Sequence, residues 1–217
     1  MGKKYGSLLF AFLVAIGSIS CTSNNPEPVT CAEIMPATIA LFPIQTVTFS
    51  EAVAWAKESF PKAEVTATES QSSISWGVEK QAYNIWLEPP FRRLSITNPL
   101  PQATVSQVIS CFGPPGYYEA VLITLPGEQR NERLTIWYPD KGYKFEVRNY
   151  GGNVSGEFSE KSLVNSAIVL TPPGTIDEMA RYIAGDSVSV LYEGLAPWIE
   201  TSSTSGIKIQ APEWTPD

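Results

Sequence analysis

Three kinds of residue could do chemistry in this chain of 217 residues: its three cysteines, its 22 acids and its aromatic rings. The sequence has no histidine, which excludes histidine-dependent triads and histidine–metal sites. It also lacks a phosphate-binding glycine loop, zinc-type or redox-type cysteine spacing and a calcium loop. Paired carboxylates suffice for glycoside hydrolysis, but only at a separation that a sequence does not reveal. We therefore expect no enzyme, no cofactor and no metal site.

Residues 1–20 have the three-part layout of a signal peptide: two lysines, an apolar run over 8–16, and small residues. The apolar run is about half as long as the ~20 residues of a transmembrane helix. The stretch Gly-Ser-Ile-Ser-Cys at 17–21 resembles the lipobox of bacterial lipoproteins, with Ser18 where leucine is commonest. The resemblance implies that Cys21 becomes the first residue and carries a lipid, including palmitate-type acyl chains. Ordinary signal peptidase would accept the same small residues, so secretion without an anchor is the alternative.

Cys31 and Cys111 are the two other cysteines. An even pair in an oxidising compartment favours a disulfide. The alternative is two buried, unpaired thiols that behave as small hydrophobes.

The charge of the mature chain argues against nucleic acid as a partner. The whole chain has 15 bases and 22 acids; residues 1–20 hold two lysines and no acid, which leaves 13 bases against 22 acids, or −9. Binding to phosphate backbones needs clustered cations instead.

A first group of elements begins with a helix over 48–60. Thr48 and Glu51 have capping-box spacing, apolar residues recur every three to four positions, and Pro61 ends the pattern. Alternating and β-branched runs then predict strands at 64–68, 73–78, 83–87 and 93–97.

A second group repeats this order. Thr104 and Gln107 again have capping-box spacing, and Gly113 ends the helix. The later segments are predicted as strands at 117–124, 132–138 and 143–148, a turn at 139–142, a loop at 149–162, a strand at 166–170, a helix at 175–185 and a strand at 206–210.

This order predicts an α+β fold, with one or more antiparallel sheets and helices packed on one face. We expect a signal peptide at 1–20, a lipid-proximal tether and approach to the domain at 21–45, the domain at 46–210, and a loose tail at 211–217. Within the domain, a hypothesis of degenerate two-fold repetition divides the chain into halves 48–100 and 104–150, followed by a C-terminal strand–helix–strand unit.

The second group also resembles a known type of protein. The strings V-x-x-V-I-x-x-F-G-x-P at 105–115 and L-x-I-x-Y-P-x-x-G-x-x-F at 134–145 are similar to small bacterial lipoproteins and inhibitors of the BamE and β-lactamase-inhibitor-protein type. In these proteins a helix that ends in Gly-x-Pro leads into a three-stranded antiparallel sheet. The resemblance implies an envelope protein that works through protein contacts, and it implies no particular partner.

The aromatic residues suggest a second kind of function. Four tryptophans lie on periodic segments and are expected in the core, namely Trp55, Trp76, Trp86 and Trp137. Tyr192 and Trp198 flank a segment predicted as an exposed loop, and such aromatics could hold a sugar ring or a partner. The alternative is a loop that folds these rings back onto the domain.

We therefore expect a non-enzymatic lipoprotein of the cell membrane or outer envelope, anchored through Cys21 on the extracytoplasmic face, with another envelope protein as its partner. A surface or secreted carbohydrate-binding module is the alternative.

Overall fold

The computed structural model describes residues 29–89, 92–97, 103–125, 129–151, 154–170, 174–175, 177, 195–197, 208–211 and 213–214. Within these residues the elements in chain order are α1 (Cys31–Ile34), α2 (Ala37–Ala40), α3 (Phe49–Ser59), β1 (Thr66–Thr68), η1 (Glu69–Gln71), β2 (Ser73–Val78), β3 (Gln81–Trp86), β4 (Arg93–Thr97), α4 (Val105–Phe112), β5 (Tyr117–Leu125), β6 (Gln129–Tyr138), η2 (Pro139–Lys141), β7 (Tyr143–Tyr150), β8 (Glu157–Ser159), β9 (Ser166–Val169), β10 (Leu195–Pro197), β11 (Lys208–Gln210) and β12 (Glu213–Trp214).

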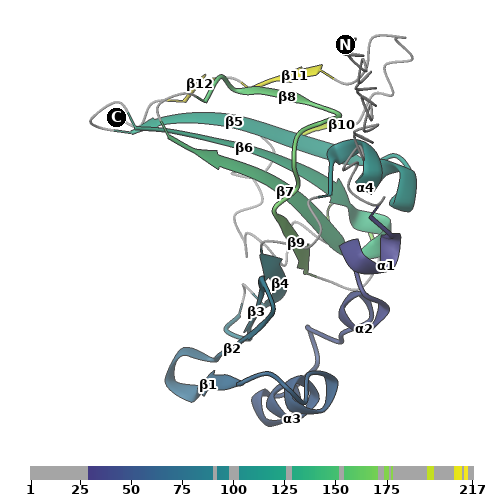
Figure 1. Ribbon diagram of the computed structural model, residues 1–217, viewed down its shortest axis with the longest axis vertical. Helices are drawn as coiled ribbons and strands as arrows, with labels where there is room; N and C mark the ends of the chain where they lie inside the picture. The colour runs from purple at the N-terminus through teal and green to yellow at the C-terminus, as the bar shows by residue number, and fades with distance from the viewer. Residues whose placement is uncertain are drawn as a thin grey trace, which may run out of the picture.

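One large sheet organises the protein (Figure 1). In the described part of the chain its strands follow the order β1-β2-β3-β4-β9-β7-β6-β5-β10, and β12 pairs with β5. The pairing of β12 with β5 is parallel, whereas the others in this sheet are antiparallel. A second, smaller sheet pairs β11 with β8. The predicted mixture of helices with a large antiparallel sheet is confirmed.

Two meanders, β2-β3-β4 and β5-β6-β7, make up most of the sheet. The last strand of each, β4 and β7, lies beside the central β9 and is antiparallel to it. Counted across the sheet, the first meander runs β2-β3-β4 and the second runs β7-β6-β5, so the strands of the second follow in the reverse of their chain order. A repeat related by translation would keep the same strand order in both meanders. The degenerate repeat stays a prediction.

One face of the sheet, called the core face below, holds the main hydrophobic core. Directly paired residues share a face, so the register Leu94–Val169–Tyr143 places both meanders on the same core. Its buried side chains occupy alternate positions of β2, β3, β4, β6, β7 and β9 and include Ile74, Trp76, Tyr83, Ile85, Leu94, Ile96, Leu134, Ile136, Tyr138, Tyr143, Phe145, Val147, Ala167 and Val169.

Helices α3 and α4 both contribute rings to the core face. Trp55 of α3 lies 6.0 Å from Trp76, measured between ring centroids, and Phe112 of α4 lies 5.2 Å from Phe145. Both helices begin at the predicted capping boxes, in which a threonine and the side chain three residues later satisfy each other's backbone amides. Gly113 ends α4 with φ +80°, a conformation that favours glycine.

The N-terminal segment belongs to the fold from about residue 30, ahead of the boundary at 46 that the sequence predicts. Its apolar side chains are buried, and Phe42 packs 4.3 Å from Trp55, between centroids. The spacing of these apolar residues fits neither helix nor strand periodicity, so residues 21–45 are predicted as a tether and the approach to the domain. Within the described part, from residue 29, the segment forms α1 and α2, and its buried residues are Ile34, Met35, Ile39, Phe42 and Ile44.

Two further differences concern the later chain. The region 149–162, predicted as a loop, contains the end of β7 and the whole of β8. The tail at 211–217, predicted as loose, contains buried Ala211 and strand β12. Strands β8 and β12 are short, and neither has apolar alternation long enough to be recognised in the sequence. Apart from residues 174–175 and 177, the helix predicted at 175–185 lies outside the described residues.

Candidate binding face

The face of the sheet opposite the core face is called the second face below. Its side chains alternate with those of the core along each strand. Over the first meander these side chains are mostly small and polar, whereas over the second meander several are charged. The second face therefore has two chemically different halves, of which the first is the more accessible.

An exposed tryptophan marks the first half. Trp86 is 37% exposed and pairs across the strands with Ser73 on one side and Arg93 on the other. The guanidinium carbon of Arg93 lies 5.7 Å from the centroid of the Trp86 ring, within the range of a cation–π contact. Ser75 and Asn84 form the next row. These five residues are called the Trp86 patch.

The second half contains a network of five ionisable residues, called the ionic cluster: Glu119, Arg133, Lys144, Glu146 and Arg148. Glu146 is fully buried, and its carboxylate lies 2.7 Å from Lys144 Nζ and 2.5 Å from Arg148 Nη2. Arg133 Nη2 lies 3.2 Å from Glu119 Oε1. Each acid thus has a basic partner from its own strand or the neighbouring strand.

The environment shifts the pKa values of this network. Burial lowers the pKa of Lys144 against the opposing attraction of Glu146. Burial also disfavours the Glu146 carboxylate, yet Lys144 and Arg148 together hold the pKa of Glu146 below its ordinary value. Glu146 is therefore ionised at neutral pH, and its charge is needed to compensate the two cations.

An apolar cluster adjoins the ionic cluster on the second face. Trp137, Ile168 and Leu170 are buried together, with Tyr117 packed against them. Lys144 Nζ lies 4.7 Å from the centroid of the Trp137 ring. The middle of the second face is therefore closed to a ligand, and its accessible parts are the Trp86 patch and the side chains at the ends of β6 and β7.

The site residues predicted from the sequence fall into two groups. Cys31 of α1 and Cys111 of α4 come together, with Cα atoms 5.3 Å apart, and the structure pairs them as a disulfide. Cys21, Tyr192 and Trp198 lie outside the described residues.

A serine nucleophile with a lysine base would need Ser-x-x-Lys spacing, and the expectation that the sequence has none is wrong, because the spacing occurs at 59–62 and at 205–208. In the first stretch, Ser59 is the last residue of α3 and Lys62 is exposed beyond Pro61. Because proline ends the helix between them, the serine and lysine do not share a helical turn. In the second, only Lys208 is described.

The described part of the chain holds no group of three or more potential metal ligands among histidine, cysteine and acids. Among the same residues, no helix is both long and apolar enough to cross a membrane. No protein-family model, curated protein or solved structure matches the chain.

Sequence reasoning missed Trp86 and the ionic cluster, although part of each signal was present. In Tyr83-Asn84-Ile85-Trp86, the buried residues Tyr83 and Ile85 alternate with Asn84 and Trp86, so the strand period already places Trp86 away from the core. The expectation that Trp86 is a core residue is wrong for this reason. Lys144, Glu146 and Arg148 alternate in the same way with core residues, so their spacing along β7 already places them on one face. The pairing of Arg133 on β6 with Glu119 on β5 could not be assigned without the register.

Proposed function

We propose that this protein is a lipid-anchored, non-enzymatic protein of the cell envelope that acts through protein contacts, with the Trp86 patch as its contact surface. The anchor is Cys21, and the protein faces the extracytoplasmic side. The observation that carries the contact surface is the exposed Trp86 beside Arg93 on a sheet surface of small polar side chains. Tryptophan and arginine are enriched among the few residues that contribute most of the binding energy of protein interfaces.

The arrangement of the helices supports this choice of face. We propose that α3 and α4 form a layer over the core face, as the ring contacts of Trp55 and Phe112 indicate. Figure 1 shows the helices running along one side of the curved sheet, from α4 to α3. A partner would then meet the sheet on the second face. A degenerate repeat of helix and meander remains part of this proposal.

Site-specific photo-crosslinking in the native envelope tests the contact surface. A photoreactive phenylalanine replaces Asn84 in the full-length chain, and we expect a crosslinked partner protein. The same residue at Lys57, which is exposed on α3, is the matched control. Trp86→Ala should abolish the crosslink from position 84. Equal crosslinking from positions 84 and 57, or no effect of Trp86→Ala, would contradict this contact surface.

The intact mass of protein extracted from membranes tests the anchor. We expect a chain that begins at Cys21 and carries the mass of a diacylglyceryl group and a further acyl chain. A bare chain recovered from the medium would contradict the anchor and would favour a secreted protein instead.

A carbohydrate-binding module is the second candidate function. One observation favours it: Ser73 and Asn84, whose side chains can form hydrogen bonds with a ligand, lie next to the Trp86 ring on the second face. A flat ring beside polar groups suits a sugar. Retardation of the purified domain in polysaccharide gels, lost in Trp86→Ala, would favour this function over protein contacts.

A further inference from the structure

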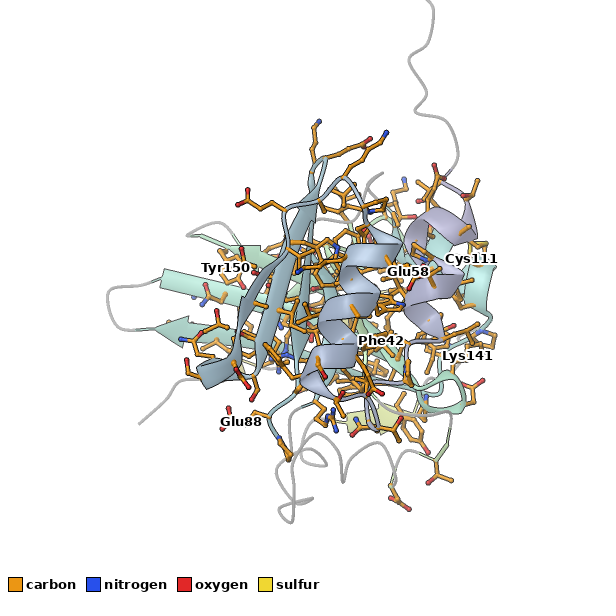
Figure 2. The ribbon with its side chains drawn as sticks, turned by 90° about the horizontal axis from the view of Figure 1, so that it is seen from below. Phe42, Glu58, Glu88, Cys111, Lys141 and Tyr150 are labelled. Carbon is orange, nitrogen blue, oxygen red and sulfur yellow. A yellow bond between two sulfur atoms is a disulfide. The ribbon has the colours of Figure 1, made fainter. Side chains whose placement is uncertain are left out.

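A small pocket lies at the accessible end of β5, β6 and β7. Its volume is about 150 Å³, and its walls are Ile123, Asn131, Glu132, Arg133, Arg148 and Tyr150. Five of these side chains belong to the second face: Ile123, Asn131 and Tyr150 form one cross-strand row, and Arg133 and Arg148 pair in the next. Figure 2 shows Tyr150 on the opposite side of the molecule from Cys111 and Lys141.

Two guanidinium groups face the same small space. Arg133 and Arg148 are directly paired across β6 and β7, and like charges in this position repel each other unless negative charge compensates them. Arg133 Nη2 pairs with Glu119, and Arg148 Nη2 pairs with Glu146. Arg148 also forms a side-chain hydrogen bond with Tyr150. An arginine has five N–H donors. Both Nε atoms are buried without a hydrogen-bond partner in the described part of the chain.

Among the residues that line the pocket, two guanidinium groups, of Arg133 and Arg148, face one carboxylate, of Glu132. Glu132 is the one acid among these lining residues, and its carboxylate accepts hydrogen bonds of 2.6 Å from Asn149 Nδ2 and from the Gly156 amide. These neutral donors fix its position and leave its charge.

The size of the pocket restricts what a bound anion can be. The pocket is smaller than the ~300 Å³ at which pockets for whole drug-sized ligands begin. A carboxylate on a short aliphatic stem fits this volume: guanidinium groups match its two oxygens, and Ile123 and Tyr150 can contact its methylene groups.

We propose that this pocket binds a carboxylate, and that in the protein's complex this carboxylate is an acidic side chain of the partner protein. The assignment to a partner rests on the proposed function, whereas carboxylate binding itself does not. The pocket and the Trp86 patch lie on the same face of the sheet, so one partner would engage both.

Sodium glutarate, a short dicarboxylate, is the probe for the pocket. In the ¹⁵N-labelled mature protein, we expect a saturable shift of the Arg133 and Arg148 Nε–Hε resonances. Arg133→Gln should weaken the apparent affinity about tenfold, the effect of losing one charged hydrogen-bonding partner. The matched control is Lys57→Gln, which removes one exposed cation elsewhere and should leave the affinity unchanged.

A second variant keeps the test valid if Arg133→Gln unfolds the protein. The double variant Glu119→Gln/Arg133→Gln removes both members of the ion pair and leaves neither unpaired, and it should also lose affinity about tenfold. No saturable shift in the unsubstituted protein, or the same affinity in folded Arg133 variants, would overturn the pocket. Inorganic phosphate binding more tightly than glutarate would overturn the choice of a carboxylate.

A photoreactive phenylalanine in place of Tyr150 distinguishes the two sources of the carboxylate. A crosslink to a partner that decreases with added glutarate supports an acidic side chain of the partner. If the partner crosslinks from position 84 but glutarate and Arg133→Gln have no effect at position 150, the partner assignment fails while the proposed function stands. If glutarate binds but no partner crosslinks from either position, the proposed function fails and the pocket serves a free carboxylate.

Discussion

The two halves of the second face carry different kinds of side chain although they belong to one continuous sheet. Over β2 and β3, Ser73, Ser75, Asn84 and Trp86 lie at a surface that solvent reaches. Over β6 and β7, Glu146 is fully buried between Lys144 and Arg148. Strand alternation decides only which face a side chain occupies. Burial decides whether that side chain is available to a ligand or needs a compensating partner within the protein.

The difference also predicts where substitutions are costly. A buried charge that loses its partner destabilises the folded state strongly, whereas an exposed ring loses little when it is removed. The first half can therefore vary to suit a partner without endangering the fold, and the second half cannot.

The largest expected effect comes from Glu146. Glu146→Gln leaves Lys144 buried without its counter-charge, and we expect the free energy of unfolding to fall by about 3–5 kcal/mol. Urea unfolding at neutral pH measures this loss. The control is Ser95→Ala, a buried polar position on β4 of the first half, with an expected loss of at most about 1 kcal/mol. Equal losses in the two variants would remove the contrast between the halves.

A double variant separates the charge from the packing. In Lys144→Met/Glu146→Leu the buried pair is replaced by apolar side chains of similar size. Arg148 loses its acid but is 41% exposed, so water can solvate it, and we expect stability near that of the unsubstituted protein. A loss as large as that of Glu146→Gln would show that the pair itself stabilises the fold.

The paired cysteines provide the next effect. Cys31–Cys111 would connect the N-terminal segment to α4. The N-terminal segment packs on the core face over the first meander, through Phe42 and Trp55, and α4 packs there over the second meander, through Phe112 and Tyr138. With a sequence separation of 80 residues, the chain-entropy relation gives a contribution of about 4 kcal/mol. We expect Cys31→Ser/Cys111→Ser to lose that much in urea unfolding. Free-thiol counting on the denatured, unreduced mature protein should find neither thiol reactive; two reactive thiols would contradict the disulfide.

Acid should weaken the second half selectively. The folded state lowers the pKa of Glu146, so its contribution to stability is present above the unfolded value near pH 4.5 and is lost as the pH falls through the folded value. One such group changes the free energy of unfolding by at most about 1.4 kcal/mol per pH unit. Urea midpoints from pH 6 to pH 3 should therefore fall more steeply in the unsubstituted protein than in Lys144→Met/Glu146→Leu. Parallel curves would contradict this assignment.

The smallest effect on stability is expected at Trp86. Trp86→Ala should lower the free energy of unfolding by about 1 kcal/mol, because the residue is 37% exposed and only part of its surface is covered in the fold. Trp76→Ala, on the adjacent strand but in the core, should cost about 3–5 kcal/mol. A soluble quencher supplies a second measurement, since it should reduce the fluorescence of Trp86 and spare Trp76. A large loss in Trp86→Ala would mean that the ring supports the fold rather than a contact.

Much of the local structure could be predicted from the sequence because it depends on residues close together in the chain. The capping boxes at Thr48 and Thr104 start α3 and α4, and Gly142, with φ +77°, closes the turn between β6 and β7. Alternation predicted β2 and β4 with their observed bounds. The candidate site was largely missed. Strand parity alone places Trp86 away from the core, whereas the ionic cluster includes a pair on neighbouring strands, Arg133 with Glu119, that needs the register.

What the sequence by itself determined is therefore the set of helices, strands and turns whose signals repeat within a few residues. The tertiary structure alone decided the position of β9 between β4 and β7, the burial of Ile34 and Ile44, and the pairing of Arg133 with Glu119. These features join residues far apart in the chain or depend on what covers a surface. The physical reason is that propensity and capping act over a few residues, whereas burial and charge compensation depend on the arrangement of the whole fold.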